Sequence, residues 1–103
     1  VSTCRDLVRI LAAARRHRRI LAALQAPSFS LAHPGGGKTF MNNHNKLLGD
    51  YDAAPVGKTG YTRAARHCFA GFFQRDGRTY YVACMGSGRF WPDLRVLTGI
   101  SQN

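Results

Sequence analysis

Acidic residues are scarce in this sequence. Only 5 Asp and Glu stand against 15 Lys and Arg, which gives a formal net charge of +10. So basic a balance favours anionic partners, such as nucleic acid, acidic lipid headgroups or an anionic cell-wall polymer. Charge alone does not choose among these three, so the partner has to be sought in the motifs.

Long apolar runs and paired cysteines are also missing. No apolar run approaches the roughly 20 residues that span a bilayer. The opening segment VSTCRDLVRI has no basic head followed by an apolar stretch, so it predicts no signal peptide. The cysteines at positions 4, 68 and 84 form no C-x-x-C pair, which argues against a zinc site or a redox motif. Cys68 and Cys84 lie in apolar runs, so we expect both to be small hydrophobes.

The composition is that of a globular chain, with 45% hydrophobic and 19% charged residues in 103. Thr3 and Asp6 fit a capping box at a helix start, the helical pattern breaks near His17, and Pro27 ends it. Neither an internal repeat nor a domain boundary is evident. We predict strands over 28–32, 38–41, 56–61, 68–75 and 78–85, a short helical or irregular segment over 42–49, and a last helix opening at Pro92 and Asp93.

The clearest local signal is the Asp76-Gly77 pair between the last two predicted strands. This dipeptide is preferred in type I′ hairpin turns, because both central residues need a positive φ. Residues 68–73 are apolar on both faces, so we expect this strand to be covered on both sides. The last helix carries Leu94, Leu97 and Ile100 at helical spacing.

Two basic segments invite a phosphate-binding interpretation. Residues 32–39 contain Gly-Lys-Thr, but Ala32 stands where a phosphate-binding loop has its first glycine, and residues 40–45 are a poor helix start. We therefore interpret residues 33–37 as a hairpin turn. The basic run over 15–19 has no interleaved aromatic residues, and we interpret it as the solvated face of a helix and its exit.

The most informative motif is Gly57-Lys58-Thr59-Gly60-Tyr61-Thr62. Lys-Thr-Gly is one of the motifs of serine β-lactamases and penicillin-binding proteins. Here it ends a predicted strand, after Asn-x-Asn-Lys-Leu-Leu at 43–48 and before a Cys-containing strand and the Asp-Gly hairpin. With the opening Ser2-Thr3-x-x-Asp6-Leu7, this order resembles low-molecular-mass D-alanyl-D-alanine carboxypeptidases over roughly residues 2 to 100.

The resemblance implies an α+β fold, the C-terminal part of the β-lactamase/transpeptidase-like fold, in which helices pack on the faces of an antiparallel sheet. Residues 1–103 would form a single partial domain that lacks the nucleophile-bearing part. Partners would be a peptidoglycan stem peptide or a β-lactam, and the N-terminal part of the same domain. The location would be the bacterial periplasm or extracytoplasmic face, and the reaction needs no cofactor or metal. A sheet cut from its parent would expose apolar surface, which predicts poor solubility or oligomerisation.

The same resemblance assigns roles to individual residues. Lys58 would place an ammonium at the reactive centre. Thr59 and Thr62 would offer hydroxyls to the terminal carboxylate of the substrate, and the backbone N–H of Tyr61 would form half of the oxyanion hole. Gly60 would leave room for the peptide along the strand edge. The predicted catalytic residues are thus Lys58, Thr59 and Gly60, and the predicted substrate-binding residues are Tyr61, Thr62 and Arg89.

Several features depart from the family pattern. No Ser-x-x-Lys occurs in the sequence, and Ser101-Gln102-Asn103 follows Lys-Thr-Gly instead of preceding it, so we take that Ser-x-Asn match as chance. Arg66 stands where relatives usually have Gly, and a bulky cation there would alter the mouth of the cleft. The family chemistry uses no histidine, so we interpret His44 and His67 as polar loop or strand-start residues.

These observations leave three functions to compare. The first is a portion of a serine-type D-Ala-D-Ala carboxypeptidase that contributes the Lys-Thr-Gly wall of the site. The second is a non-catalytic basic structural or interaction subunit that retains this piece of the fold. The third, a nucleic-acid-binding domain, rests on charge alone and ranks last. Without Ser-x-x-Lys, acyl transfer by this chain alone is not expected.

Overall fold

The computed structural model describes residues 1–48 and 55–99. None of the helices in this described part is long and apolar enough to cross a membrane. In chain order the elements are α1 (Cys4–Ala14), α2 (Arg18–Gln25), β1 (Ser28–Ala32), β2 (Lys38–Asn42), β3 (Val56–Thr62), β4 (Arg66–Arg75), β5 (Arg78–Ser87) and α3 (Phe90–Thr98).

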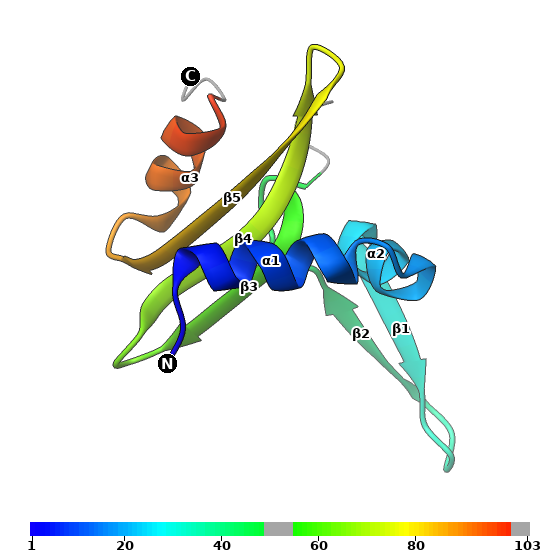
Figure 1. Cartoon of the computed structure of the whole chain (residues 1–103). Coiled ribbons are helices and arrows are strands. Elements are labelled where there is room, and N and C mark those ends of the chain that lie inside the picture. The colour runs from blue at the N-terminus through cyan, green and yellow to red at the C-terminus, as the bar shows by residue number, and fades with distance from the viewer. Residues whose placement is uncertain (49–54, 100–103) are drawn as a thin grey trace.

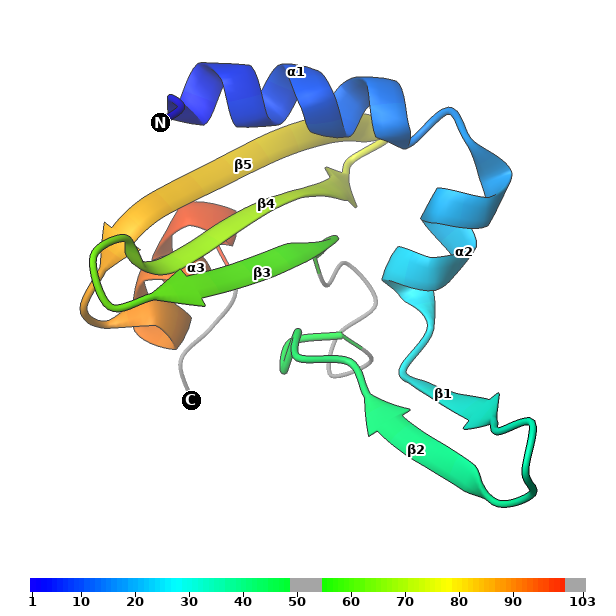
Figure 2. The same ribbon diagram turned by 90° about the horizontal axis from the view of Figure 1, so that it is seen from below.

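The centre of the molecule is an antiparallel sheet of strand order β3-β4-β5. Helix α1 crosses one face of this sheet, and α3 packs on the opposite face, as Figures 1 and 2 show from two directions. Phe72 of β4 is buried under the guanidinium of Arg15, which lies 4.5 Å from the centre of its ring. Phe69 and Phe73 are buried in a core cluster that includes Leu94 of α3. The prediction of an α+β fold with a doubly covered strand is therefore confirmed.

The core lies mainly between the sheet and α3. Cys84 packs against it, and burial raises the pKa of this thiol above its ordinary value. Both Cys68 and Cys84 are half-buried, as expected for small hydrophobic side chains. The buried members of the cluster are Leu47, Phe69, Phe73, Val82, Phe90 and Leu94.

The N-terminal elements follow the sequence pattern closely. The hydroxyl of Thr3 accepts a hydrogen bond from the backbone N–H of Asp6 at 3.1 Å, which caps α1. The helical pattern breaks as predicted, with His17 at the N-cap of α2. Strands β1 and β2 form a hairpin that projects away from the sheet (Figure 2) and has every residue exposed. Its turn contains Gly36 and Gly37 at φ values of 96° and 82°, so the hairpin interpretation of this glycine run is confirmed.

The β4–β5 hairpin turns at Asp76 and Gly77, whose φ values are 52° and 75°. The type I′ prediction is consistent with these positive values. Both strands are longer than predicted, because pairing continues past Phe69 through an irregularity in register to the pair His67 and Ser87.

The start of the last helix was predicted wrongly. Helix α3 begins at Phe90, with Arg89 as its N-cap, rather than at Pro92 and Asp93. Pro92 fits inside the first turn because the N–H groups there have no intrahelical partner to lose. Leu94 is buried as its spacing suggested, whereas Leu97 is 52% exposed. Ile100 and the 101–103 segment lie outside the described residues.

Candidate active site

The Lys-Thr-Gly motif lies on β3, at one edge of the sheet. Within the described residues β3 pairs with β4 alone, so its other edge carries no strand. Successive side chains on a strand point to opposite faces. Lys58, Thr59 and Gly60 border both a groove under α1 and a hollow that faces α3, and Tyr61 borders the second of these together with Phe90. The motif therefore offers functional groups on both sides of an open strand edge.

Two glycines bring β3 close to its neighbour. Gly57 and Gly71 are cross-strand partners, and a Cβ built on Gly57 would collide with the backbone of Ala70 and Gly71. Gly60 differs, because a Cβ there would meet no atom within 4 Å. Gly57 is thus required for pairing, while Gly60 keeps the strand edge clear.

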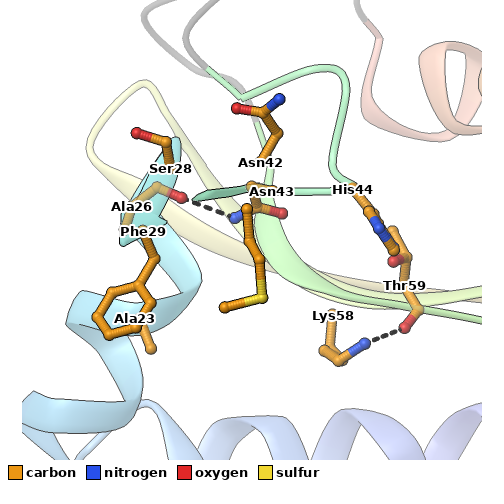
Figure 3. Close-up of a pocket in the computed structure, with 10 residues that line it drawn as sticks. Ala23, Ala26, Ser28, Phe29, Asn42, Asn43, His44, Lys58 and Thr59 are labelled. Atoms are coloured by element: carbon orange, nitrogen blue, oxygen red, sulfur yellow. Dashed lines mark hydrogen bonds between the residues drawn. The ribbon is translucent and has the colours of Figure 1, made fainter. Parts of the chain in front are cut away.

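Lys58 is exposed, and its Nζ donates a hydrogen bond to the backbone oxygen of Thr59 (Figure 3). Lys58 and Thr59 border three separate hollows of about 470, 400 and 440 Å³. The first, shown in Figure 3, lies between α2, the base of the β1–β2 hairpin and β3. The second is an apolar groove against α1 and α2, and the third faces α3. Lys58 and Thr59 are therefore shared by the three surfaces around this edge.

The third hollow gathers most of the predicted site. Lys58, Thr59, Gly60 and Tyr61 all line it, whereas Thr62 and Arg89 are not among its described lining residues. No acidic residue appears in that described lining, so a carboxylate entering there would meet positive charge. The remaining lining residues are His44, Lys46, His67, Phe90 and Trp91.

Tyr61 is held by an aromatic stack. Its ring lies 4.6 Å from that of His67, its cross-strand partner, and the His67 ring lies 5.2 Å from that of Phe90. This stack links the C-terminal end of β3 to the first residue of α3. It gives His67 a packing role at the start of β4, in line with the interpretation of a polar strand-start residue.

Sequence reasoning missed the part played by Asn43 and Asn45. The Asn43 amide donates to the carbonyls of Leu24 and Ala26 at the end of α2, at 3.1 and 3.0 Å, and Figure 3 shows the second bond. The Asn45 amide is buried and donates to the carbonyl of Pro55 at 2.7 Å, just before β3. Asn43 therefore fixes the end of β2 against the end of α2, and Asn45 fixes the segment after β2 against the residue before β3. The only sequence signal was two amides placed beside an apolar pair.

Thr62 and Arg89 occupy structural positions at the far end of the sheet. The Thr62 hydroxyl accepts a hydrogen bond from the N–H of Ala65 at 3.0 Å, and its own O–H remains able to donate. The N–H of Arg89 donates to the Ser87 hydroxyl at 3.2 Å, and that hydroxyl donates to the Asp93 carboxylate at 2.7 Å. These bonds hold the backbone of Arg89 at the N-cap of α3. Its part in substrate binding stays a prediction.

Chemically, this edge suits binding and charge stabilisation. It combines an ammonium, hydroxyls and an open strand backbone, which together fit an extended peptide that ends in a carboxylate. The described residues contain no cluster of His, Cys, Asp or Glu that could hold a metal ion.

Comparisons with known proteins point to one family, although no family model matches the chain. The chain is 34% identical over 102 residues to the D-alanyl-D-alanine carboxypeptidase DacB2 of Mycobacterium tuberculosis, a match that covers 93% of this chain and 35% of the relative. A crystal structure of a D-alanyl-D-alanine carboxypeptidase from the same organism superimposes with a TM-score of 0.80 and 34% identity, over 99% of this chain and 41% of the other.

A more distant structure agrees. A mutant of the Streptomyces K15 DD-transpeptidase superimposes with a TM-score of 0.77 and 25% identity, over 96% of this chain and 40% of the other. The chain therefore spans between a third and a half of the length of these relatives. From the motif order, the fold and these matches, we conclude that the chain is homologous to a portion of the D-alanyl-D-alanine carboxypeptidases and shares the fold of their DD-transpeptidase relatives.

Proposed function

We propose that this chain forms the Lys-Thr-Gly wall of a serine-type D-Ala-D-Ala carboxypeptidase. The enzyme would trim D-alanine from peptidoglycan stem peptides through an acyl-enzyme, at the extracytoplasmic face of a bacterium. One observation carries the proposal: the four residues from Lys58 to Tyr61 line a single hollow at an open strand edge, in a described lining without acidic residues.

Each residue of the wall has a distinct task in this proposal. The Lys58 ammonium attracts the terminal carboxylate of the peptide and favours the deprotonated form of a nearby hydroxyl. Thr59 donates a hydroxyl hydrogen bond to that carboxylate, while Thr62 and Arg89 contact the peptide farther along the sheet end. The Tyr61 N–H stabilises the oxyanion of the tetrahedral intermediate. The peptide lies along β3 as an added strand, which the bare position at Gly60 allows.

The nucleophile and its base must come from outside these residues, since the sequence contains no Ser-x-x-Lys. The apolar groove beside Lys58 supports this requirement, because it is an uncovered hydrophobic surface next to the reactive edge. We propose that residues 1–103 are part of one domain whose N-terminal part covers this groove and brings the serine to Lys58. The described residues that line the groove are Leu7, Ile10, Leu11, Ala14, Ile20, Leu24, Lys58, Thr59, Gly60, Cys68, Phe69 and Ala70.

A second candidate is a non-catalytic structural or interaction subunit that retains this piece of the fold. The observation in its favour is the β1–β2 hairpin, where Phe29, Leu31, Phe40 and Met41 are all at least 43% exposed. Together with the net charge of +10, such a surface suits binding to an anionic partner. Under this candidate the Lys58 ammonium has no special importance.

Substitution of Lys58 separates the two candidates. We expect Lys58→Ala to abolish labelling of the native protein by a fluorescent penicillin, because the ammonium that attracts the carboxylate is lost. The matched control is Lys38→Ala, which removes an exposed cation from the start of β2, outside the three hollows that Lys58 borders. Labelling that survives Lys58→Ala, or that is lost equally in both variants, would contradict the proposal.

A further inference from the structure

Two non-glycine residues in the described part of the chain have a positive φ. Asp76 has φ 52° and Arg66 has φ 60°. Asp76 is accounted for by its hairpin turn, since Asp tolerates this region through local hydrogen bonds of its short side chain. Arg has no such compensation, and glycine would adopt the same backbone without the steric cost. The presence of Arg at position 66 therefore calls for a reason other than local folding.

Arg66 is exposed to solvent although its backbone is strained. It opens β4 directly opposite Thr62, the last residue of the motif strand. One terminal nitrogen of its guanidinium lies 3.6 Å from the point where a Cβ on Gly88 would sit, so the guanidinium rests over the end of β5. The next residue along the chain is Arg89. Two exposed guanidinium groups are thus carried at the end of the sheet where β3 ends.

The Arg66 guanidinium has no acidic partner among the residues that the structure describes. Within residues 1–48 and 55–99, no carboxylate forms a hydrogen bond or ion pair with the Arg66 guanidinium. A guanidinium presents its donors in a planar fork that matches a carboxylate, and charge-assisted pairs of this kind are the strong ones. An anionic group is therefore the ligand that this position fits.

We infer that Arg66 is a specificity-determining residue that binds a carboxylate side chain on the peptide lying along β3. This inference rests on the proposed function, which puts a D-alanyl-D-alanine end at Lys58 and Thr59. If that peptide runs antiparallel to β3, the residue preceding the two D-alanines reaches the Thr62–Arg66 end, since each residue of a strand advances about 3.3 Å. The ligand is then an acidic residue at that position of the peptide.

The test compares two peptides of equal size on the full 103-residue chain. N-acetyl-L-glutamyl-D-alanyl-D-alanine and its L-glutaminyl counterpart are titrated separately, and their dissociation constants are measured by NMR chemical-shift changes at the β3 amides. We expect the glutamyl peptide to bind about fivefold more tightly, a size typical of an exposed charge pair. In Arg66→Gly this preference falls to about onefold, and in Arg66→Lys part of it remains.

The matched control is Asp76→Gly, which relieves the other positive φ and leaves the Arg66 cation in place. Both glycine variants are expected to melt at or above the temperature of the parent chain, while only Arg66→Gly loses the glutamyl preference. Equal binding of the two peptides by the parent chain, or a preference that persists in Arg66→Gly, would overturn the inference alone. If neither peptide binds, the proposed function falls, and the inference falls with it.

Discussion

The two halves of this chain differ sharply in how much they bury. The sheet β3-β4-β5 with α3 holds most of the core cluster, including Phe69, Val82 and Leu94. Helix α2 has no buried residue, and both strands of the β1–β2 hairpin are exposed throughout. The contrast shows that the motif strand lies at the edge of the part of the chain that contains most of the buried core. The hairpin and α2 instead present apolar side chains that only a partner surface would cover.

The largest expected effect is the loss of stability on replacing a buried phenylalanine, compared with an exposed phenylalanine in the other half of the chain. Phe69→Ala should lower the free energy of unfolding by about 3 to 5 kcal/mol, because the side chain is 1% exposed and its removal leaves a cavity. Phe40→Ala, at 66% exposure in the hairpin, should change it by less than about 0.5 kcal/mol. Chemical denaturation followed by circular dichroism measures both. If both variants lost the same free energy of unfolding, the difference in burial between the two halves would be contradicted.

Two glycine-to-alanine variants, one in each half, test the same difference in stability with a smaller expected effect. Gly57→Ala forces a Cβ against the backbone of Ala70 and Gly71, and should cost about 1 to 3 kcal/mol while pushing β3 from β4. Gly35→Ala lies in the hairpin turn with no atom within 4 Å, and should change the stability by less than about 0.5 kcal/mol. Denaturation midpoints report the cost, and amide hydrogen exchange of β3 reports the strand separation. Unchanged exchange in Gly57→Ala would count against the close approach.

Local patterns made much of the fold predictable from the sequence. The Asp76-Gly77 turn and the doubly apolar β4 could be predicted because each depends on residues adjacent in the chain. The sequence also predicted that the Lys-Thr-Gly motif lies on a strand, which is β3. By contrast, the Asn43 and Asn45 ties and the Tyr61–His67–Phe90 stack depend on contacts between distant segments, which no periodicity reveals.

Two features could not be predicted from local sequence preferences: the start of α3 and the positive φ of Arg66. Pro92 looked like the first helical residue, whereas Ser87 and Asp93 join across the strand–helix junction and the helix begins at Phe90. Arg is not a residue that local preference puts at a positive φ. At Arg66 this local preference is overridden, and the strained backbone keeps an exposed guanidinium beside the end of the motif strand.

The smallest expected effect concerns the cysteines. Cys4 is exposed at the start of α1, whereas burial raises the pKa of the half-buried Cys84 thiol in the sheet above its ordinary value of 9.0. Iodoacetamide at pH 8 should therefore modify Cys4 well before Cys84, as peptide mass spectrometry of timed samples would show. Faster modification of Cys84 would mean that the sheet opens more readily than its core suggests.

The same shift has a consequence for stability. Because the folded-state pKa of Cys84 lies above the unfolded value of 9.0, the contribution of the protonated thiol is fully present below pH 9.0. It is lost as the pH rises through the folded-state pKa. A Cys84→Ala variant should therefore lose less stability than the parent chain between neutral and strongly alkaline pH, as thermal melts across that range would show.

We propose that this chain supplies one wall of a site whose nucleophile lies outside residues 1–103. Labelling of the native material with a fluorescent penicillin, read on a denaturing gel, tests it most directly. We expect a labelled band well above the 11.4 kDa of this chain, because the acylated serine belongs to a longer protein that contains the wall. An unlabelled protein that runs at 11.4 kDa would contradict it and favour the non-catalytic subunit.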